Sequence, residues 1–391
     1  MKIVDVTEFW SERGGGVRSY LTAKAASVTA LGAEHRIIAP GPRNEESSLA
    51  EQRGNGSRLV RFAGPHLPYD PTYHLFSRFA AVRQRVREEA PDVLEIHSPE
   101  LAALAAMCAK KGTYGIRTLV WHSDFIDTYL ASRIQERSSA RTANVLTAPL
   151  WAWVRGVASR CHATVVASAW QARKLRLHGV PRVHQLPFGV DKRVFRPEAR
   201  DEEFRQRFLG QRKGALLVSV GRLAGEKRVD VLIEGFRKLR ARRDAVLLVV
   251  GDGPERHRLE AQARGSADIV FLGFERDRTR LARIVASADA LLHAGPFETF
   301  GLAIAEALAC ATPVVVPTLG GAAEVAPEAC SERHTAGDAD ALVAACERLL
   351  ARDPNELAAS ARAASALVIS EQEHFGALLK LYRELLQGAR N

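Results

Sequence analysis

The chain has 391 residues, of which 47% are apolar and 26% charged, so it is expected to fold as two soluble globular domains, and a disordered chain is excluded. Its formal net charge of +10 gives a basic surface, which can attract phosphorylated substrates, anionic lipid headgroups or nucleic acid, although solvated helix faces explain it more simply. No apolar run reaches the roughly 20 residues of a membrane span, and the five scattered cysteines form no CxxC pair, which argues against a zinc site or a disulfide framework and favours a reducing cytosol.

Short apolar runs alternate with amphipathic stretches along the first half of the chain. MKIVDV at the start predicts a buried strand rather than a signal peptide, because no basic segment leads into an apolar one. We expect further strands at 35–40, 58–64, 92–98, 118–123, 163–168 and 184–190, and helices at 17–31, 75–89 and 99–111. This rhythm predicts a parallel sheet covered by helices on both faces.

The segment 186–201 interrupts this rhythm with Pro187, Gly189 and Pro197, and a domain boundary is expected there. The alternation then resumes. We expect strands at 215–221, 245–251, 269–273, 290–295 and 312–317, and helices at 228–242, 254–264, 277–286 and 301–310.

Glycines follow the first predicted strand. Gly14, Gly15 and Gly16 precede a helix, so the backbone can approach a ligand there and the helix start can present N–H groups to a phosphate. Neither a Walker A loop nor a GxGxxG fingerprint is present. Without further information, a flexible turn explains the three glycines equally well.

Two cations follow the strand at 215–221. Arg222 and Lys227 can neutralise a diphosphate and stabilise it as a leaving group, although a lone Arg/Lys pair is more often ordinary surface charge. Gly251-Asp252-Gly253-Pro254 ends the next strand and fits either a nucleotide loop or a tight turn.

The segment 293–325 is the most informative. Glu298 lies in the loop after a strand and Glu306 in the following helix; drawn as one helix, they would stand about 12 Å apart. That separation suits two carboxylates that grip different hydroxyls of a long ligand, such as a sugar and a ribose, although spacing alone also permits coincidence. Phe300, Gly301 and Leu302 start the helix, where backbone N–H groups can bind phosphate.

Together these pieces resemble glycosyltransferase family 4, of the GT-B fold, over nearly the whole chain. ETFGLAIAE matches the E-x7-E motif of that family, and the N-terminal glycine loop, PFGVD, GRLAGEK and GDGP agree in order and spacing. The resemblance implies an α/β protein of two Rossmann-like domains facing across a cleft. Residues 1–190 would form the acceptor-side domain and 191–370 the nucleotide-sugar-binding domain, with a C-terminal helix, 371–391, packing back on the first.

The resemblance also implies roles for the donor-binding residues. Arg222 and Lys227 would hold the diphosphate, Glu298 would bind hydroxyls of the donor sugar and Glu306 would bind the ribose. Backbone N–H groups would help to hold the phosphates; they belong to Gly15, Gly16, Phe300, Gly301 and Leu302.

On the acceptor side, His122 corresponds to a family histidine that faces the donor sugar; without the resemblance, a buried structural histidine is the simpler interpretation. WHSDFIDTYL resembles a mannosyltransferase segment and favours a GDP-mannose or UDP-hexose donor. Asp124 and Asp127 either face the acceptor or cap a helix, and capping is the favoured reading. Loops at 41–57, 63–76 and 124–147 are expected to select the acceptor, the last as a long, polar, mobile loop.

The predicted activity is that of a retaining hexosyltransferase that moves mannose or glucose to a hydroxyl of a lipid, glycan or small molecule. His122, Glu298, Arg222 and Lys227 are the predicted catalytic residues. Because no nucleophile stands out, we expect front-face displacement through an oxocarbenium-like state. GDP- or UDP-hexose is a co-substrate, and no cofactor or metal is expected.

The predicted partners are a nucleotide sugar, the acceptor and an anionic membrane surface, but no nucleic acid, and the predicted location is the cytoplasm or the inner membrane face. The Asp338-Ala339-Asp340 triplet mimics a DxD metal motif and is interpreted as solvated surface. Ala311 stands where the family often has glycine and is interpreted as a packing position. PLWAWV, 149–154, is expected in the core rather than as a lipid anchor.

Other functions stay open. An epimerase or a phosphorylase could use the same fold, and so could a non-catalytic nucleotide-binding scaffold. A nucleic-acid binder is suggested by charge alone, and the interleaved aromatic and basic residues of such proteins are missing.

Overall fold

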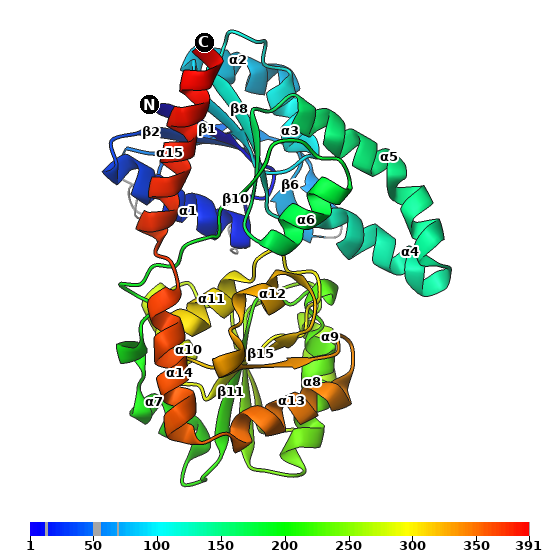
Figure 1. Cartoon of the computed structure of the whole chain (residues 1–391), viewed down its shortest axis with the longest axis vertical. Coiled ribbons are helices and arrows are strands. Elements are labelled where there is room, and N and C mark those ends of the chain that lie inside the picture. The colour runs from blue at the N-terminus through cyan, green and yellow to red at the C-terminus, as the bar shows by residue number, and fades with distance from the viewer. Residues whose placement is uncertain (12–14, 50–55, 69, 391) are drawn as a thin grey trace. The chain divides into compact units, whose positions relative to one another are not determined.

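The computed structural model describes residues 1–11, 15–49, 56–68 and 70–390, and it divides the chain into two compact units. The first unit is Met1–Gly189 together with Glu371–Asn391, and the second is Val190–Ser370 (Figure 1). Gly14 of the predicted glycine loop lies outside the described residues.

The first unit is built on an eight-stranded sheet with the order β10-β9-β8-β7-β1-β2-β4-β3, in which β3 alone is antiparallel to its neighbour. β5 (His66–Leu67) and β6 (Asp70–His74) form a separate antiparallel pair. The strands of the large sheet are β1 Lys2–Val6, β2 Glu34–Gly41, β3 Glu45–Ser48, β4 Arg58–Ala63, β7 Val93–Ile96, β8 Ile116–Trp121, β9 Ala163–Val166 and β10 Val183–Gln185.

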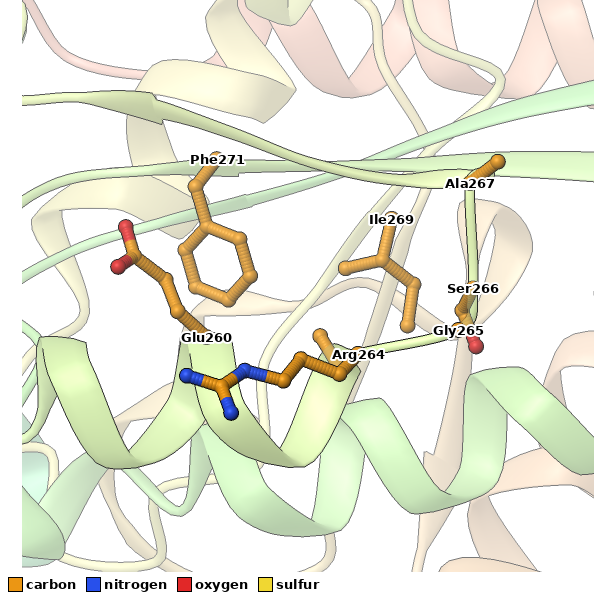
Figure 2. A pocket seen from close by; sticks show the side chains of 8 residues that line it. Glu260, Arg264, Gly265, Ser266, Ala267, Ile269 and Phe271 are labelled. Carbon is orange, nitrogen blue, oxygen red and sulfur yellow. The ribbon is translucent and has the colours of Figure 1, made fainter.

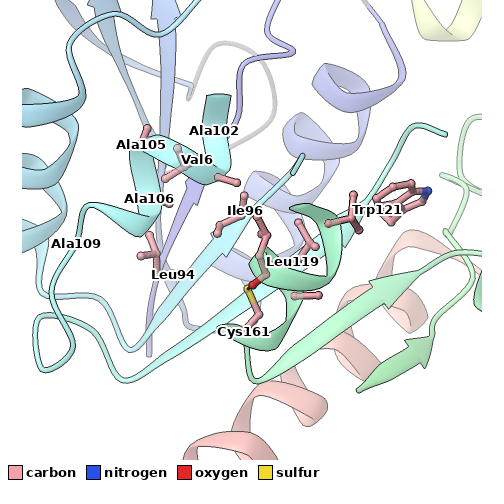
Figure 3. Close-up of a cluster of buried hydrophobic side chains, with 14 of the residues drawn as sticks. Val6, Leu94, Ile96, Ala102, Ala105, Ala106, Ala109, Leu119, Trp121 and Cys161 are labelled. Carbon is pink, nitrogen blue, oxygen red and sulfur yellow. The ribbon is translucent and has the colours of Figure 1, made fainter. Parts of the chain in front are cut away.

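Helices cover this sheet, and apolar side chains fill the space between. Val6, Leu94 and Ile96 of the strands lie beside alanines of α3, as Figure 3 shows. The last helix, α15, lies beside α1 within the same unit (Figure 1). The helices are α1 Gly16–Ala30, α2 Phe79–Glu89, α3 Leu101–Met107, α4 Ser132–Arg137, α5 Ala140–Ser159, α6 Ala169–Leu177 and α15 Glu371–Arg390.

The second unit has a six-stranded, wholly parallel sheet with the order β13-β12-β11-β14-β15-β16. This is the 3-2-1-4-5-6 order of a Rossmann sheet. Its strands are β11 Ala215–Val220, β12 Ala245–Val250, β13 Ile269–Gly273, β14 Ala290–Leu292, β15 Val314–Pro317 and β16 Ser331–His334.

Amphipathic helices with capped starts surround the second sheet. Asp201, Asp277, Asp338 and Asp353 each accept backbone N–H groups at a helix start. α8, α9 and α13 share one hydrophobic core, whereas α11 contacts both α10 and α14 (Figure 1). The helices are α7 Glu202–Leu209, α8 Val229–Arg240, α9 Arg256–Ala263, α10 Arg278–Ala286, α11 Leu302–Ala309, α12 Gly320–Val325, α13 Ala339–Ala351 and α14 Pro354–Leu367.

All three predicted loops contain regular structure: β3 lies within 41–57, and β5 and β6 lie within 63–76. Residues 124–147 contain a π-helical turn, Asp127–Ala131, then α4 and the first turns of α5. Ser139 caps α5 by accepting the N–H of Thr142, and buried Ile126 ties the segment to the core. Trp151 of the PLWAWV segment is buried, as expected, whereas Trp153 is 38% exposed.

The strand orders locate the ligand-binding end of each sheet. The order reverses between β1 and β7 in the first unit and between β11 and β14 in the second. Ligands of open parallel sheets bind beyond the carboxyl ends of the strands at such a reversal. The loops that follow β1, β7, β11 and β14 are therefore the places to look for a site.

Candidate active site

A half-buried ion pair lies beyond β11 and β14 of the second unit. Lys227, in the 3-10 turn Gly225–Lys227, donates to Oε1 of Glu298 through its Nζ. Nε2 of His293 lies 3.4 Å from the same oxygen. Arg222 precedes this turn, with Nη1 3.9 Å from Glu226 Oε1. The structure thus gathers Arg222, Lys227 and Glu298 on two adjacent loops.

Each partner of this pair keeps the other ionised. Burial opposes the charge on both side chains, but mutual attraction outweighs it, lowering the pKa of Glu298 and raising that of Lys227. Burial also lowers the pKa of His293 to about 4, so this imidazole is neutral at pH 7.

Two glycines place the Glu298 loop. The N–H of Gly321 donates to the backbone oxygen of Glu298 at 2.7 Å. A Cβ on Gly320 would lie 2.7 Å from the oxygen of Pro296, and one on Gly321 would lie 2.6 Å from the carbonyl carbon of Thr299. Only glycine lets the start of α12 approach the loop this closely.

The GDGP turn is explained by packing. Gly251 has φ 144°, and a Cβ there would lie 1.8 Å from the oxygen of Gly221; a Cβ on Gly253 would lie 2.4 Å from the oxygen of Leu223. Both glycines therefore hold the loop that carries Arg222, which supports the tight-turn interpretation.

Glu306 lies on α11, whose start is shaped by Gly301 with φ 94°. Phe300, Gly301 and Leu302 form this start, as expected. Glu306 is 4% exposed, and its Oε1 accepts from Arg278 Nη2 at 2.6 Å. Sequence reasoning missed Arg278, because no spacing links the start of α10 to α11.

The first unit brings the N-terminal glycines to the start of α1. Gly15, with φ 129°, precedes the helix, and a Cβ on it would lie 2.8 Å from the Tyr73 hydroxyl oxygen. Gly16 has open space on its Cβ side. The glycine requirement is therefore specific to Gly15.

His122 follows β8 and is half-buried among aromatic rings. Its Nε2 lies 2.8 Å from Nδ1 of His97, which follows the neighbouring strand β7. Tyr20 and Phe188 contact the His122 ring at centroid distances of 4.9 and 5.4 Å. Burial, with help from His97 and Lys24, holds the pKa of His122 well below its ordinary value.

Asp124 and Asp127 are held by a lysine rather than capping a helix. Lys174 of α6 donates to both carboxylates, and Gln171 Nε2 donates to Asp124 Oδ2 at 3.3 Å. Asp124 is 3% exposed, and its backbone oxygen accepts the N–H of Thr128. The favoured capping interpretation is wrong because the nearby cation binds both side chains.

An unpredicted carboxyl pair follows β1 and β7. Glu8 accepts from the Ser98 hydroxyl at 2.6 Å and from the N–H of Ala102 at 3.0 Å. Burial, reinforced by Glu8, raises the pKa of Glu100 to about 8. The pair could not be predicted from the sequence, because its two glutamates follow strands that are far apart along the chain.

Two further features lie apart from these loops. The Asp338-Asp340 triplet caps α13 and pairs Asp340 with Lys238 on the surface, as expected. A shallow hollow between α9 and β13, with Glu260, Arg264 and Phe271 in its lining (Figure 2), lies by the amino end of an edge strand, opposite the ligand-binding end.

Within the described residues, one cluster offers three ligand atoms suited to a metal: Asp5, Glu95 and His97. Lys24 Nζ lies between the two carboxylates, 2.8 Å from Asp5 and 2.5 Å from Glu95. The ammonium group therefore supplies the cation that this cluster needs.

Comparison with known families gives a match in each unit. Residues 15–189 match the family described as "Glycosyl transferase 4-like domain", and residues 214–352 match "Glycosyl transferases group 1".

Two mannosyltransferase relatives match this chain over most of their length. The chain is 31% identical over 326 residues, 83% of this chain and 81% of the relative, to a GDP-mannose-dependent α-(1-6)-phosphatidylinositol dimannoside mannosyltransferase of Mycobacterium tuberculosis. It is 28% identical over 380 residues, 96% of this chain and 91% of the relative, to a GDP-mannose-dependent α-mannosyltransferase of Mycolicibacterium smegmatis.

Solved structures share the fold. Sucrose-phosphate synthase from Thermosynechococcus elongatus aligns with a TM-score of 0.79 at 19% identity, covering 99% of both chains. Anabaena HepE in complex with UDP-glucose aligns with a TM-score of 0.70 at 18% identity, covering 97% of this chain and 99% of that one.

Proposed function

The chain belongs to glycosyltransferase family 4 and is a hexosyltransferase of the GT-B fold that uses a nucleotide sugar; from this premise we propose that its donor is GDP-mannose and its acceptor a hydroxyl of a lipid-linked glycan. The mannosyltransferase relatives support this choice of donor and acceptor.

One observation carries the proposal: Lys227 and Glu298 meet at the carboxyl ends of β11 and β14, beside the loop of Arg222. Binding of a diphosphate requires cations, and binding of a sugar requires groups that accept hydrogen bonds from its hydroxyls. The cations and the carboxylate of Glu298 lie here on adjacent loops. In the proposal Arg222 and Lys227 bind the diphosphate, Glu298 binds hydroxyls of mannose and Glu306 binds those of ribose.

The remaining donor contacts come from backbone and from the first unit. Phe300, Gly301 and Leu302 at the start of α11 offer N–H groups to the phosphates, as do Gly15 and Gly16 at the start of α1. His122 contacts the transferred sugar. These roles follow the family resemblance.

The proposed reaction retains the configuration of the sugar carbon. The bond from that carbon to the diphosphate oxygen breaks through an oxocarbenium-like state, and the acceptor oxygen bonds to the same face. Arg222 and Lys227 stabilise the negative charge that builds on the leaving diphosphate. The acceptor proton passes to a diphosphate oxygen, so the proposal needs no resident cofactor.

A donor panel tests the proposal. A ligand that binds only the folded protein raises its melting temperature, by an amount that grows with concentration over Kd. GDP-mannose should raise it more than UDP-glucose or ADP-glucose, and transfer to a lipid-linked mannoside should follow. Stabilisation by UDP-glucose without an effect of GDP-mannose would contradict the choice of donor.

The proposed acceptor implies contact with an anionic lipid surface, and α4 and α5 offer a fitting face. Val145 and Leu146 of α5 are 65% and 60% exposed, and exposed Arg137 and Arg141 lie at the junction of the two helices. No helix in the described part of the chain has the length and apolar character to cross a bilayer. Apolar side chains beside cations favour docking on a membrane of negative charge.

Vesicle flotation tests this surface. The protein should bind phosphatidylglycerol vesicles more than phosphatidylcholine vesicles, and Val145→Asp with Leu146→Asp should abolish binding. Arg207→Glu, an exposed change on α7, serves as the charge control. Equal binding of the double variant, or burial of this face in a dimer of the chain, would contradict the proposal.

A further inference from the structure

One nitrogen of the His122 ring faces a second histidine. Nε2 points inward to Nδ1 of His97, 2.8 Å away, and His97 is fully buried. One of these two nitrogens must carry the shared proton, and the other must accept it. The proton on His97 therefore decides which nitrogen of His122 can accept a hydrogen bond from a ligand.

Behind His97 lie two buried carboxylates. His97 Nε2 is 3.3 Å from Glu95 Oε1 and 3.5 Å from Asp5 Oδ1, and all three side chains are fully buried. Lys24 is the ammonium that pairs with both acids. Two carboxylates against one ammonium leave a net negative charge beside Nε2, which favours a proton on that nitrogen.

Asp5 is held in its charged form. Burial opposes ionisation of Asp5, but Lys24, His35 and His97 outweigh it and keep its pKa well below the ordinary value. Burial likewise opposes the charge on Lys24, and Asp5 and Glu95 outweigh it, raising that pKa. Glu95 Oε2 also accepts from the hydroxyls of Tyr382 and Thr118.

We propose that His97 is a positioning residue that fixes the tautomer of His122. His97 keeps its proton on Nε2, toward Asp5 and Glu95, and its Nδ1 accepts the Nε2–H of His122. Nδ1 of His122 then bears a lone pair and accepts a hydrogen bond from a hydroxyl of the donor sugar. This last step rests on the proposed function, in which His122 contacts that sugar.

The low pKa of His122 agrees with this assignment, since a neutral imidazole has one nitrogen without a proton. The opposite tautomer would aim the lone pair of His97 Nε2 at two carboxylates, which is electrostatically unfavourable. The buried charges of Asp5, Glu95 and Lys24 thus set the tautomer of His97, and His97 in turn sets the tautomer of His122.

His35 provides a matched control. It is also fully buried, and its Nε2 donates to Asp5 Oδ2 at 2.7 Å, while its Nδ1 accepts from the Ser57 hydroxyl at 3.2 Å. It shares the carboxylate with His97 but has no contact with His122. His35→Phe therefore removes a hydrogen bond to Asp5 but leaves the hydrogen bond between His97 and His122 in place.

Nitrogen-15 NMR of histidine-labelled protein tests the tautomer without donor, with His122→Gln identifying the His122 signals. We expect wild-type His122 to carry its proton on Nε2 and to keep it there in His35→Phe. In His97→Phe that preference should be lost, and kcat/KM for mannosyl transfer should fall about 10–100-fold, as when the partner that orients a metal-bound histidine is removed. His97→Asn, whose amide oxygen can accept the same bond, should restore part of both.

A wild-type signal with the proton on Nδ1 would overturn the proposal even if His97→Phe fails to fold. An unchanged tautomer in His97→Phe would do the same. Failure of the donor proposal would look different, because the tautomer would be as expected while GDP-mannose failed to bind.

Discussion

At the scale of the residue, the candidate donor site depends on charges that exist in pairs. Lys227 and Glu298 each shift the pKa of the other toward the charged form, against their partial burial. Removing one of the two side chains leaves the charge of the other without its partner. Function and local stability are therefore coupled at this pair.

Lys227→Met tests that coupling. We expect kcat to fall about 100-fold or more, because a cation at the leaving diphosphate is lost, and the melting temperature to fall slightly because Glu298 is left unpaired. Lys238→Met, at an exposed lysine of the same unit that pairs with Asp340, should leave both unchanged. Near-normal turnover of Lys227→Met would rule out its role.

Arg278 is the second residue-scale prediction. Its guanidinium holds Glu306 and stacks on Phe195 at 4.5 Å, so Arg278→Ala frees the carboxylate proposed to bind ribose. We expect KM for the donor to rise about tenfold, the effect of losing about 1.4 kcal/mol of binding free energy. Arg280→Ala, an exposed arginine on the same helix, is the control, and an equal KM in both variants would contradict the assignment.

At the scale of the element, backbone conformation explains which residue type is favoured at the end of α11. Ala311, interpreted as a packing position from the sequence, has φ 55°, in the left-handed region that favours glycine. It follows α11, where the N–H of Ala311 bonds to Leu308 and that of Thr312 to Ala307. The departure from the family therefore costs backbone strain rather than packing.

Ala311→Gly should consequently stabilise the protein, by up to about 1 kcal/mol, because glycine adopts this conformation without a Cβ clash. Ala309→Gly, two residues earlier inside α11, should destabilise it by a similar amount. Chemical denaturation measures the change in the free energy of unfolding of each variant relative to the wild type. A destabilised Ala311→Gly would contradict the explanation.

The elements with strong apolar runs could be predicted from the sequence. β12 and β15 are such runs, and the E-x7-E segment placed Glu298 in a loop and Glu306 on a helix, as observed. β3 could not be predicted, because Glu45–Ser48 carries no apolar residue and pairs only at a sheet edge. His97 and Arg278 were missed because their partners lie on neighbouring elements, a relation that linear spacing does not encode.

At the scale of the whole molecule, buried neutral histidines make stability depend on pH. Burial lowers the pKa of His293 and of His374 to about 4, against about 6.5 in an unfolded chain. Between these values the unfolded state binds more protons than the folded state. The stability that these two histidines contribute is therefore full above about pH 6.5 and falls as the pH drops toward 4. Glu100, whose pKa is raised to about 8, binds more protons in the folded state and offsets part of this fall.

Denaturant unfolding between pH 4 and pH 7 should show this fall. His374→Asn should reduce it, because its amide can still donate to the Pro187 oxygen without titrating. His257→Asn, at an exposed position on α9, should leave the slope as in the wild type. A stability that does not change over this range would contradict the prediction.

The central claim is that the second unit binds a nucleoside diphosphate through Arg222 and Lys227, with Glu306 on the ribose. The most direct measurement is a crystal structure of the protein with GDP. We expect phosphate oxygens within hydrogen-bond distance of Arg222 and Lys227, and ribose hydroxyls within hydrogen-bond distance of Glu306. A diphosphate bound elsewhere, with both cations turned away from it, would contradict the account.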